Sequence, residues 1–157
     1  MRPVKGWLIL LVVLTGCASG TSATTPSPTP NLGAEYTRIA APLNASLVLL
    51  NDAINATPQD NPRIRKAAAA SQAAEVKFNA DLLSLAAEAP TNVRTDVDVL
   101  RKAIAAKEVL TQGIVNATDE NIVAAVNAFA SYSVTGAASR VKSDLGLASA
   151  PNTSPTP

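Results

Sequence analysis

The chain has few side chains that could carry out chemistry. It contains no histidine, and Cys17 and Met1 are its single cysteine and single methionine. Protein sites for zinc, copper and haem depend on imidazole, thiolate or thioether ligands, and serine-type catalytic triads depend on histidine. The composition therefore predicts a protein without a metal or another cofactor, and it excludes histidine-dependent catalysis.

Carboxylates are the remaining candidates for acid and base catalysis. The closest pair in the sequence is Asp96 and Asp98, which lie two residues apart in a predicted helix. Side chains with that spacing point in different directions, so the pair forms no catalytic dyad without partners from elsewhere. We expect a solvated helix face here, and we predict that the protein is not an enzyme.

Two charged residues fall on the apolar stripes of their predicted helices. Glu75 and Lys107 lie at nearly the same distance along the chain from Pro90, where these two helices meet. Because an antiparallel pair brings them level, we predict an interhelical ion pair that fixes the register. Two alternatives stay open, namely a Lys107 ammonium group that extends to solvent and a polar pocket for a ligand. Counting residues in the same way along the last two predicted helices brings Arg140 level with Asp96, and we predict a second ion pair between them.

Three basic residues, Arg63, Arg65 and Lys66, crowd the start of a predicted helix, where the helix dipole disfavours cations. They form either a solvated helix start or a contact patch for an anionic partner, such as an envelope protein or a wall polymer. The whole chain has no large basic excess, since its 13 basic side chains face 12 acidic ones. We therefore expect no nucleic-acid binding.

Helices must position these groups, because four segments show the 3.6-residue apolar period of an amphipathic helix. The predicted helices cover residues 33–56, 61–88, 91–115 and 118–146. Asn61, Thr91 and Thr118 are the expected N-caps of the last three. Short connections make neighbouring helices antiparallel, so we predict an all-α, up-down-up-down four-helix bundle.

Two of these helices are predicted to be irregular. Pro42 interrupts the first, but it falls opposite the apolar stripe, so we expect a kink rather than a break. In the last helix the apolar stripe begins with Phe129 and then drifts to Val134 and Val141. That helix should bend, or change its partner face, near residues 131–136.

The segment before Cys17 has the layout of an export signal. Two basic residues are followed by an apolar run over residues 7–14 and by a small-residue end. The run is too short to cross a bilayer, which needs about 20 apolar residues. These features predict a signal peptide over residues 1–16.

Leu14, Thr15, Gly16 and Cys17 form the sequence L-T-G-C, which resembles a bacterial lipobox. The resemblance implies that the signal is cut before Cys17, that its thiol is joined to diacylglycerol, and that its new amino group often carries a fatty acid such as palmitate. Two or more acyl chains hold a protein stably on a membrane. The implied location is the extracytoplasmic face of the bacterial cell membrane. The alternative is an ordinary secretory signal with an incidental cysteine.

The rest of the chain agrees with that layout. Residues 17–32 and 149–157 are rich in Ser, Thr and Pro, and we expect a disordered tether and tail around one domain at 33–148. Together, the lipobox, the tether and the Ala-rich helical domain resemble the small lipoproteins of actinobacteria, a group with no agreed activity. If the host has an outer membrane, Ala18 after the cysteine would by resemblance permit transport there.

The sequence thus predicts a membrane-anchored helical module that acts through protein or envelope contacts. The alternative is a carrier of a small apolar or lipid-like ligand held between the helices. The Ala-rich interior favours tight packing, whereas the drift of the last apolar stripe could open a cavity.

Overall fold

The fold is an all-α helical bundle, as the sequence predicts. A computed structural model describes residues 31–147. Within that range the chain forms five helices and no strand. The helices are α1 (Leu32–Asn55), α2 (Asn61–Glu88), α3 (Thr91–Val115), α4 (Ile122–Ser131) and α5 (Thr135–Asp144).

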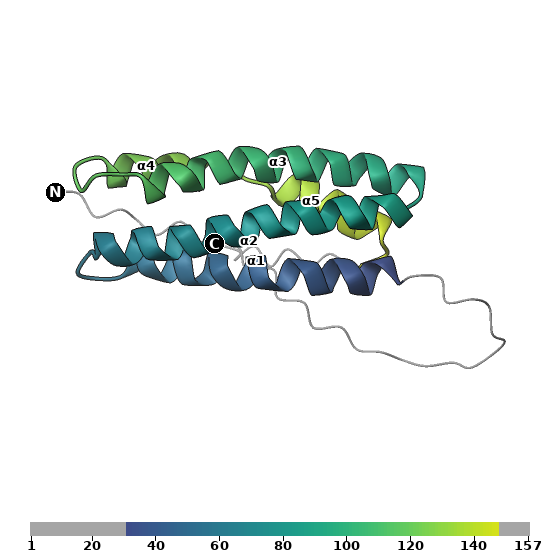
Figure 1. Cartoon of the computed structure of the whole chain (residues 1–157), viewed down its shortest axis with the longest axis horizontal. Helices are drawn as coiled ribbons and strands as arrows, with labels where there is room; N and C mark the ends of the chain where they lie inside the picture. The colour runs from purple at the N-terminus through teal and green to yellow at the C-terminus, as the bar shows by residue number, and fades with distance from the viewer. Residues whose placement is uncertain (1–30, 148–157) are drawn as a thin grey trace, which may run out of the picture.

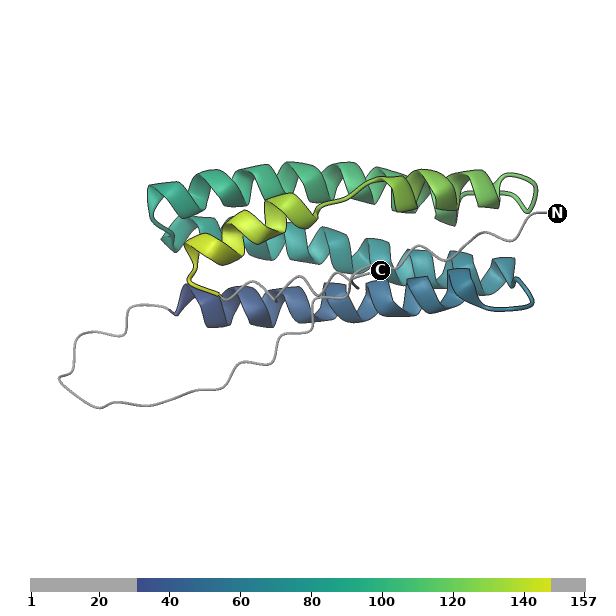
Figure 2. The same ribbon diagram turned by 180° about the vertical axis from the view of Figure 1, so that it is seen from behind.

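The first three helices are long and antiparallel, and α4 and α5 return one after the other along α3 (Figures 1 and 2). α2 packs against both α1 and α3, and α4 and α5 each pack against α3. The start of α1, the α2–α3 connection and the end of α5 lie together at one end, called here the proximal end. The α1–α2 connection (residues 56–60) and the α3–α4 connection (residues 116–121) lie together at the other end, the distal end.

Apolar side chains from all five helices fill the interior in two clusters, and most of them occupy the predicted stripe positions. The larger cluster is built on Tyr36, Leu43, Phe78, Leu82, Val97, Leu100, Ile104 and Val141. The smaller cluster is built on Leu50, Ile64, Ala68, Ile114, Ile122 and Phe129. Because each fully buried large side chain contributes roughly 1.5 to 3 kcal/mol, these contacts drive the packing of the helices.

The bounds of α2 and α3 are those that the sequence predicts, but the caps differ. Asp60, not Asn61, is the N-cap of α2, and its Oδ1 accepts a hydrogen bond from the Arg63 amide at 3.0 Å. Thr91 is the first residue of α3 rather than its cap, and the N-cap Pro90 has no side-chain hydrogen bond to offer. An aspartate one residue earlier thus takes the role predicted for Asn61.

α1 begins and ends one residue before the predicted range of 33–56. Asn31 caps it, since its Oδ1 accepts a hydrogen bond from the Ala34 amide at 3.0 Å. Leu32 is therefore helical and does not belong to the predicted tether. The helix is continuous through Pro42, which lies on the exposed side as the stripe predicts.

The single helix predicted over residues 118–146 is wrong, because two ten-residue helices take its place. Thr118 is not a helix cap; its carbonyl accepts from the Ile122 amide at 3.0 Å in the turn before α4. Tyr132 is extended, with φ −98° and ψ 121°, and ends α4. Ser133 Oγ then accepts from the first amide of α5, that of Thr135, at 3.2 Å. The predicted irregularity lies in the right place, but it is a break rather than a bend.

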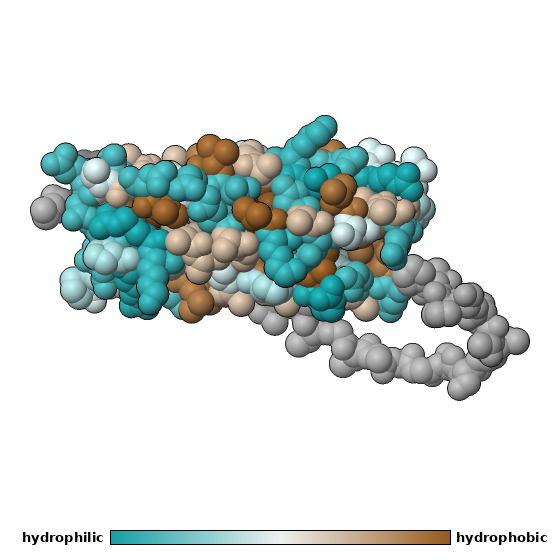
Figure 3. All heavy atoms as spheres, in the orientation of Figure 1, coloured by the Kyte–Doolittle hydropathy of each residue, from teal (hydrophilic) through white to brown (hydrophobic). Residues whose placement is uncertain are grey.

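The surface carries several large apolar side chains, which Figure 3 shows for one face as separate patches among hydrophilic residues. The exposed large apolar residues are Leu49, Val76, Leu83, Val99, Val109 and Val123. One stretch, Ile122–Asp144, is long and apolar enough to cross a membrane by length and composition, and 11% of its most apolar window is buried. Exposed apolar side chains thus occur on four helices. Few residues of α4 and α5 are buried.

Candidate functional site

A buried polar cluster lies between α2 and α3. It consists of Ser71 and Glu75 on α2 and Thr111 on α3, each at most 1% exposed. Thr111 Oγ1 donates to Glu75 Oε1 and to the Lys107 carbonyl, at 3.1 Å from each. Glu75 Oε2 and Ser71 Oγ have no hydrogen-bond partner among the described residues. The cluster therefore keeps an acidic group with one unpaired oxygen in the interior.

Burial governs the protonation of this acidic group. It raises the pKa of Glu75 to about 7, while the Thr111 hydrogen bond and the Lys107 charge oppose the rise and the Glu108 charge adds to it. A carboxyl group in an apolar interior favours its neutral form, because the charged form has lost its hydration. Glu75 thus changes its charge near neutral pH.

Lys107 extends from α3 to the end of α4. Its Nζ donates to the carbonyl oxygens of Phe129 at 2.6 Å and Tyr132 at 2.8 Å, and it lies 3.5 Å from the centroid of the Phe129 ring. Burial lowers the pKa of Lys107 to about 8, and the charge of Glu75 opposes that shift. The carbonyl groups at a helix C-terminus carry partial negative charge, so the ammonium group is stabilised there.

The ion pair predicted between Glu75 and Lys107 is wrong in its geometry. Each side chain shifts the pKa of the other, but no nitrogen–oxygen distance of 4.0 Å or less joins them. The long Lys107 stem brings its ammonium group to two carbonyl acceptors that exist only because α4 ends at Ser131. A continuous last helix, as predicted, would not have offered them.

The second predicted ion pair, between Asp96 and Arg140, is not formed either. Arg140 is exposed and Asp96 is half-buried, and no ion pair among the described residues joins them. The break before α5 changes how that helix lies along α3. Asn92 Nδ2 instead donates to Asp144 Oδ2 at 3.2 Å near the proximal end.

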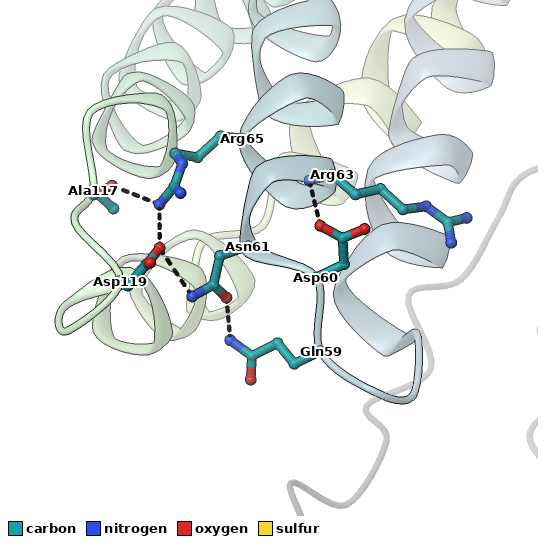
Figure 4. Close-up of polar contacts among 7 residues, drawn as sticks. All are labelled: Gln59, Asp60, Asn61, Arg63, Arg65, Ala117 and Asp119. Atoms are coloured by element: carbon teal, nitrogen blue, oxygen red, sulfur yellow. Dashed lines mark hydrogen bonds and ion pairs between the residues drawn. The ribbon is translucent and has the colours of Figure 1, made fainter.

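A network of polar side chains joins the two connections at the distal end (Figure 4). Arg65 Nη1 donates to Asp119 Oδ1 at 2.8 Å and to the Ala117 carbonyl at 3.1 Å. Asn61 Nδ2 also donates to Asp119 Oδ1, at 3.1 Å, and Gln59 Nε2 donates to Asn61 Oδ1 at 2.7 Å. The hydrogen bonds from Arg65 and Asn61 lower the pKa of Asp119. One member of the predicted basic patch is thus neutralised within the fold.

The other two members of that patch, Arg63 and Lys66, are exposed. Figure 4 shows the Arg63 side chain directed away from the network around Asp119. An open pocket of about 580 Å³ lies next to it at the distal end. Its lining residues are Ala56, Thr57, Pro58, Gln59, Asp60, Asn61, Pro62, Arg63 and Asp119.

The described part of the chain contains no group of three histidine, cysteine, aspartate or glutamate side chains that could hold a metal ion. No protein-family model, curated protein or solved structure matches the chain. The functional argument therefore depends on the geometry of the bundle itself.

The remaining site predictions have different outcomes. Leu14, Thr15, Gly16 and Cys17 lie outside the described residues, so the lipobox stays a prediction. Ser71 and Thr111 were not predicted as members of the buried cluster. They lie four residues from Glu75 and Lys107, on the same helix faces, so the helical period contains that signal. Residue type alone does not show that a serine or a threonine is buried, because both residues also occur on exposed helix faces.

Proposed function

We propose that the protein is a membrane-anchored, non-enzymatic lipoprotein whose bundle presents its distal end to a partner in the cell envelope. The observation that carries this proposal is where the first helix begins and where the last helix ends. α1 begins and α5 ends at the proximal end, while the open pocket and the exposed basic residues lie at the distal end (Figures 1 and 2).

The proximal end is closed by tight packing between the two ends of the domain. A Cβ atom on Gly33 would lie 3.1 Å from Leu147 Cδ2 and 3.3 Å from the Leu145 carbonyl oxygen, so a larger residue here would require these neighbours to shift. A tether that enters α1 here leaves the opposite end free. Since α1 has 24 residues, the distal end is about 36 Å farther along the bundle.

The chemistry of the distal end suits a polar partner. Arg63 and Lys66 supply exposed cationic groups beside the pocket, and Asp60 and Gln59 add an exposed carboxylate and an exposed amide. Such a mixed polar surface favours a protein or a wall polymer with anionic and hydrogen-bonding groups. The carrier alternative has no comparable support, because this pocket is open and polar.

The anchor is tested by replacing Cys17→Ser in the full chain expressed in a bacterium that processes lipoproteins. We expect the parent protein in the membrane fraction, with a mass increased by its lipid, and the variant in the soluble fraction. A parent protein that is secreted without a lipid would overturn the anchoring half of the proposal.

The contact surface is tested with a photoactivatable residue at position 63, and with the same residue at position 88 as a matched control. Arg63 and Glu88 are both exposed and lie at opposite ends of α2. We expect one discrete crosslinked product from position 63 in intact cells and none from position 88. Equal crosslinking at both positions would contradict distal presentation.

A further inference from the structure

The break between α4 and α5 contains no proline, but Ser133 Oγ accepts from the first amide of α5 and Gly136 lies in the first turn of that helix. Tyr132, Ser133 and Val134 include no proline and no glycine. A side chain from outside that bonds to the backbone of a helix can also support a break. In a continuous helix the Phe129 carbonyl would accept from the Ser133 amide. Here the Phe129 carbonyl accepts from the Tyr132 amide at 3.3 Å and also from Lys107 Nζ at 2.6 Å. The Tyr132 carbonyl accepts from Lys107 Nζ at 2.8 Å.

Lys107 is therefore the group from outside the segment that holds the break. Its ammonium group also lies over the Phe129 ring, so three contacts concentrate on the last turn of α4. Ser133 Oγ supports the start of α5 from within the segment, at 3.2 Å from the Thr135 amide. The break is thus supported by Ser133 from within the segment and by Lys107 from α3.

The segment that Lys107 holds has an unusual composition for its position. No charged residue occurs from Asn121 to Ser139. A core helix of a globular domain can be equally apolar because it is mostly buried, but only 11% of the most apolar window of this segment is buried. Ile122, Phe129 and Val141 are the three residues of α4 and α5 that are fully covered. The segment is thus without charge over most of its length, and it contributes only a few side chains to the core.

We propose that Lys107 is a latch that keeps residues 122–144 on the bundle as two helices, and that the other partner of this segment is the apolar layer of a lipid bilayer. This proposal depends on the proposed function insofar as the anchor holds the bundle beside a membrane. When the latch opens, α4 and α5 join into one helix, which satisfies the backbone groups of the break internally. A bilayer accepts only such a continuous helix.

The dimensions and charges of the segment favour a bilayer over a second copy of the chain. The 19 residues from Asn121 to Ser139 carry no charge and would give a helix of about 28 Å, close to the hydrocarbon layer of a bilayer, which is about 30 Å thick. Glu120 precedes the apolar stretch, and Arg140, Lys142 and Asp144 follow it. Charges at both ends of a membrane helix lie at the interfaces, where long basic side chains reach water.

The latch is tested by hydrogen exchange of the full chain in solution with Lys107→Met, which keeps the apolar stem and removes the donor. Lys102→Met is the matched control, since Lys102 lies on the same helix and is exposed. We expect amides of α4 and α5 to exchange at least tenfold faster in Lys107→Met only, with α1 and α2 unchanged. A change of the same size in all helices, or no change, would overturn the latch. Lys107→Gln, which retains an uncharged N–H donor, should give an intermediate rate.

The bilayer is tested by flotation with phosphatidylcholine vesicles, with Cys17→Ser in every chain so that no lipid anchor contributes. We expect at least five times more of the Lys107→Met chain in the floated fraction than of the Lys102→Met chain or the parent. Equal flotation of all three chains would overturn the bilayer as partner, as would a variant that dimerises instead of floating. Because the anchor is absent from this experiment, its outcome is separate from the outcome of the anchoring test.

Discussion

The α2–α3 pair and the α4–α5 segment differ in what holds them in place. α2 and α3 are continuous over 28 and 25 residues, they pack along their whole length, and their bounds follow from the sequence. α4 and α5 have ten residues each, pack mainly on α3, and meet at a break that a side chain of α3 maintains. Local pattern is enough to specify a helix with a complete apolar face, whereas a shallowly packed segment depends on single tertiary contacts.

The same difference applies to the two buried charged groups. Glu75 lies inside the α2–α3 pair, where a hydroxyl group satisfies one of its oxygens. Lys107 extends out of that pair to the end of α4, where two carbonyl groups satisfy its ammonium. The first group makes the stability of the α2–α3 pair depend on pH, and the second joins α3 to the end of α4. Four experiments test this contrast, from the largest expected effect to the smallest.

The strongest test removes one core side chain from each region. Phe129→Ala and Leu82→Ala each empty a site that is at most 2% exposed, and such substitutions cost about 3 kcal/mol or more. We expect Phe129→Ala to lower the opening free energy of α4 and α5 in native-state hydrogen exchange while α2 and α3 keep theirs. Leu82→Ala should lower the opening free energy of all helices together. Identical exchange patterns for the two variants would show that the regions are one cooperative unit.

The second test uses the pH dependence of Glu75. Its pKa is raised to about 7 in the folded protein from an ordinary value of 4.5, so the folded state binds the proton more tightly than the unfolded state. The free energy of unfolding should therefore fall as the pH rises from 4.5 to 7, by about 3 kcal/mol. In Glu75→Gln this slope should disappear in urea titrations at several pH values. A slope that persists in the variant would assign it to another group.

The third test compares the two helix starts within the rigid pair. Asp60→Ala removes the hydrogen bond to the Arg63 amide and should cost about 1 kcal/mol. Thr91→Ala is the control, because α3 begins without a side-chain cap. We expect it to leave the midpoint of thermal unfolding nearly unchanged. Equal losses would mean that Thr91 stabilises α3 by a contact other than a cap.

The smallest effect is expected at the distal network. Asp119→Asn weakens the bonds from Arg65 and Asn61, but its side chain is 70% exposed, so solvent screens the ion pair. The decrease in the midpoint of thermal unfolding should be smaller than for Asp60→Ala. Salt should reduce it further. A larger loss than that of Asp60→Ala would make this network, and not the α2 cap, the main support of the distal end.

Much of the fold could be predicted because helical periodicity and turn residues are local signals. The bounds 61–88 and 91–115 follow from apolar spacing and from Pro90, and the irregularity near Ser133 follows from the drift of the last stripe. The candidate site was less predictable. Glu75 and Lys107 stand out as charged residues on apolar stripes, but which atoms they bond depends on how neighbouring helices end. Arg65 likewise looked like a free cation until the α3–α4 connection brought Asp119 beside it.

The sequence by itself determined the helical class, the antiparallel order of α1 to α3 and the placement of the core residues, because these depend on which residues share a helix face. It also determined the absence of histidine and of a second cysteine, and so limited the available chemistry. Only the tertiary structure decided where the last helix breaks, which partners Lys107 takes and which side chains meet at the distal end. The physical reason is that these features depend on the distance between groups far apart in the chain, such as Lys107 and Tyr132, and helical period carries no information about that distance.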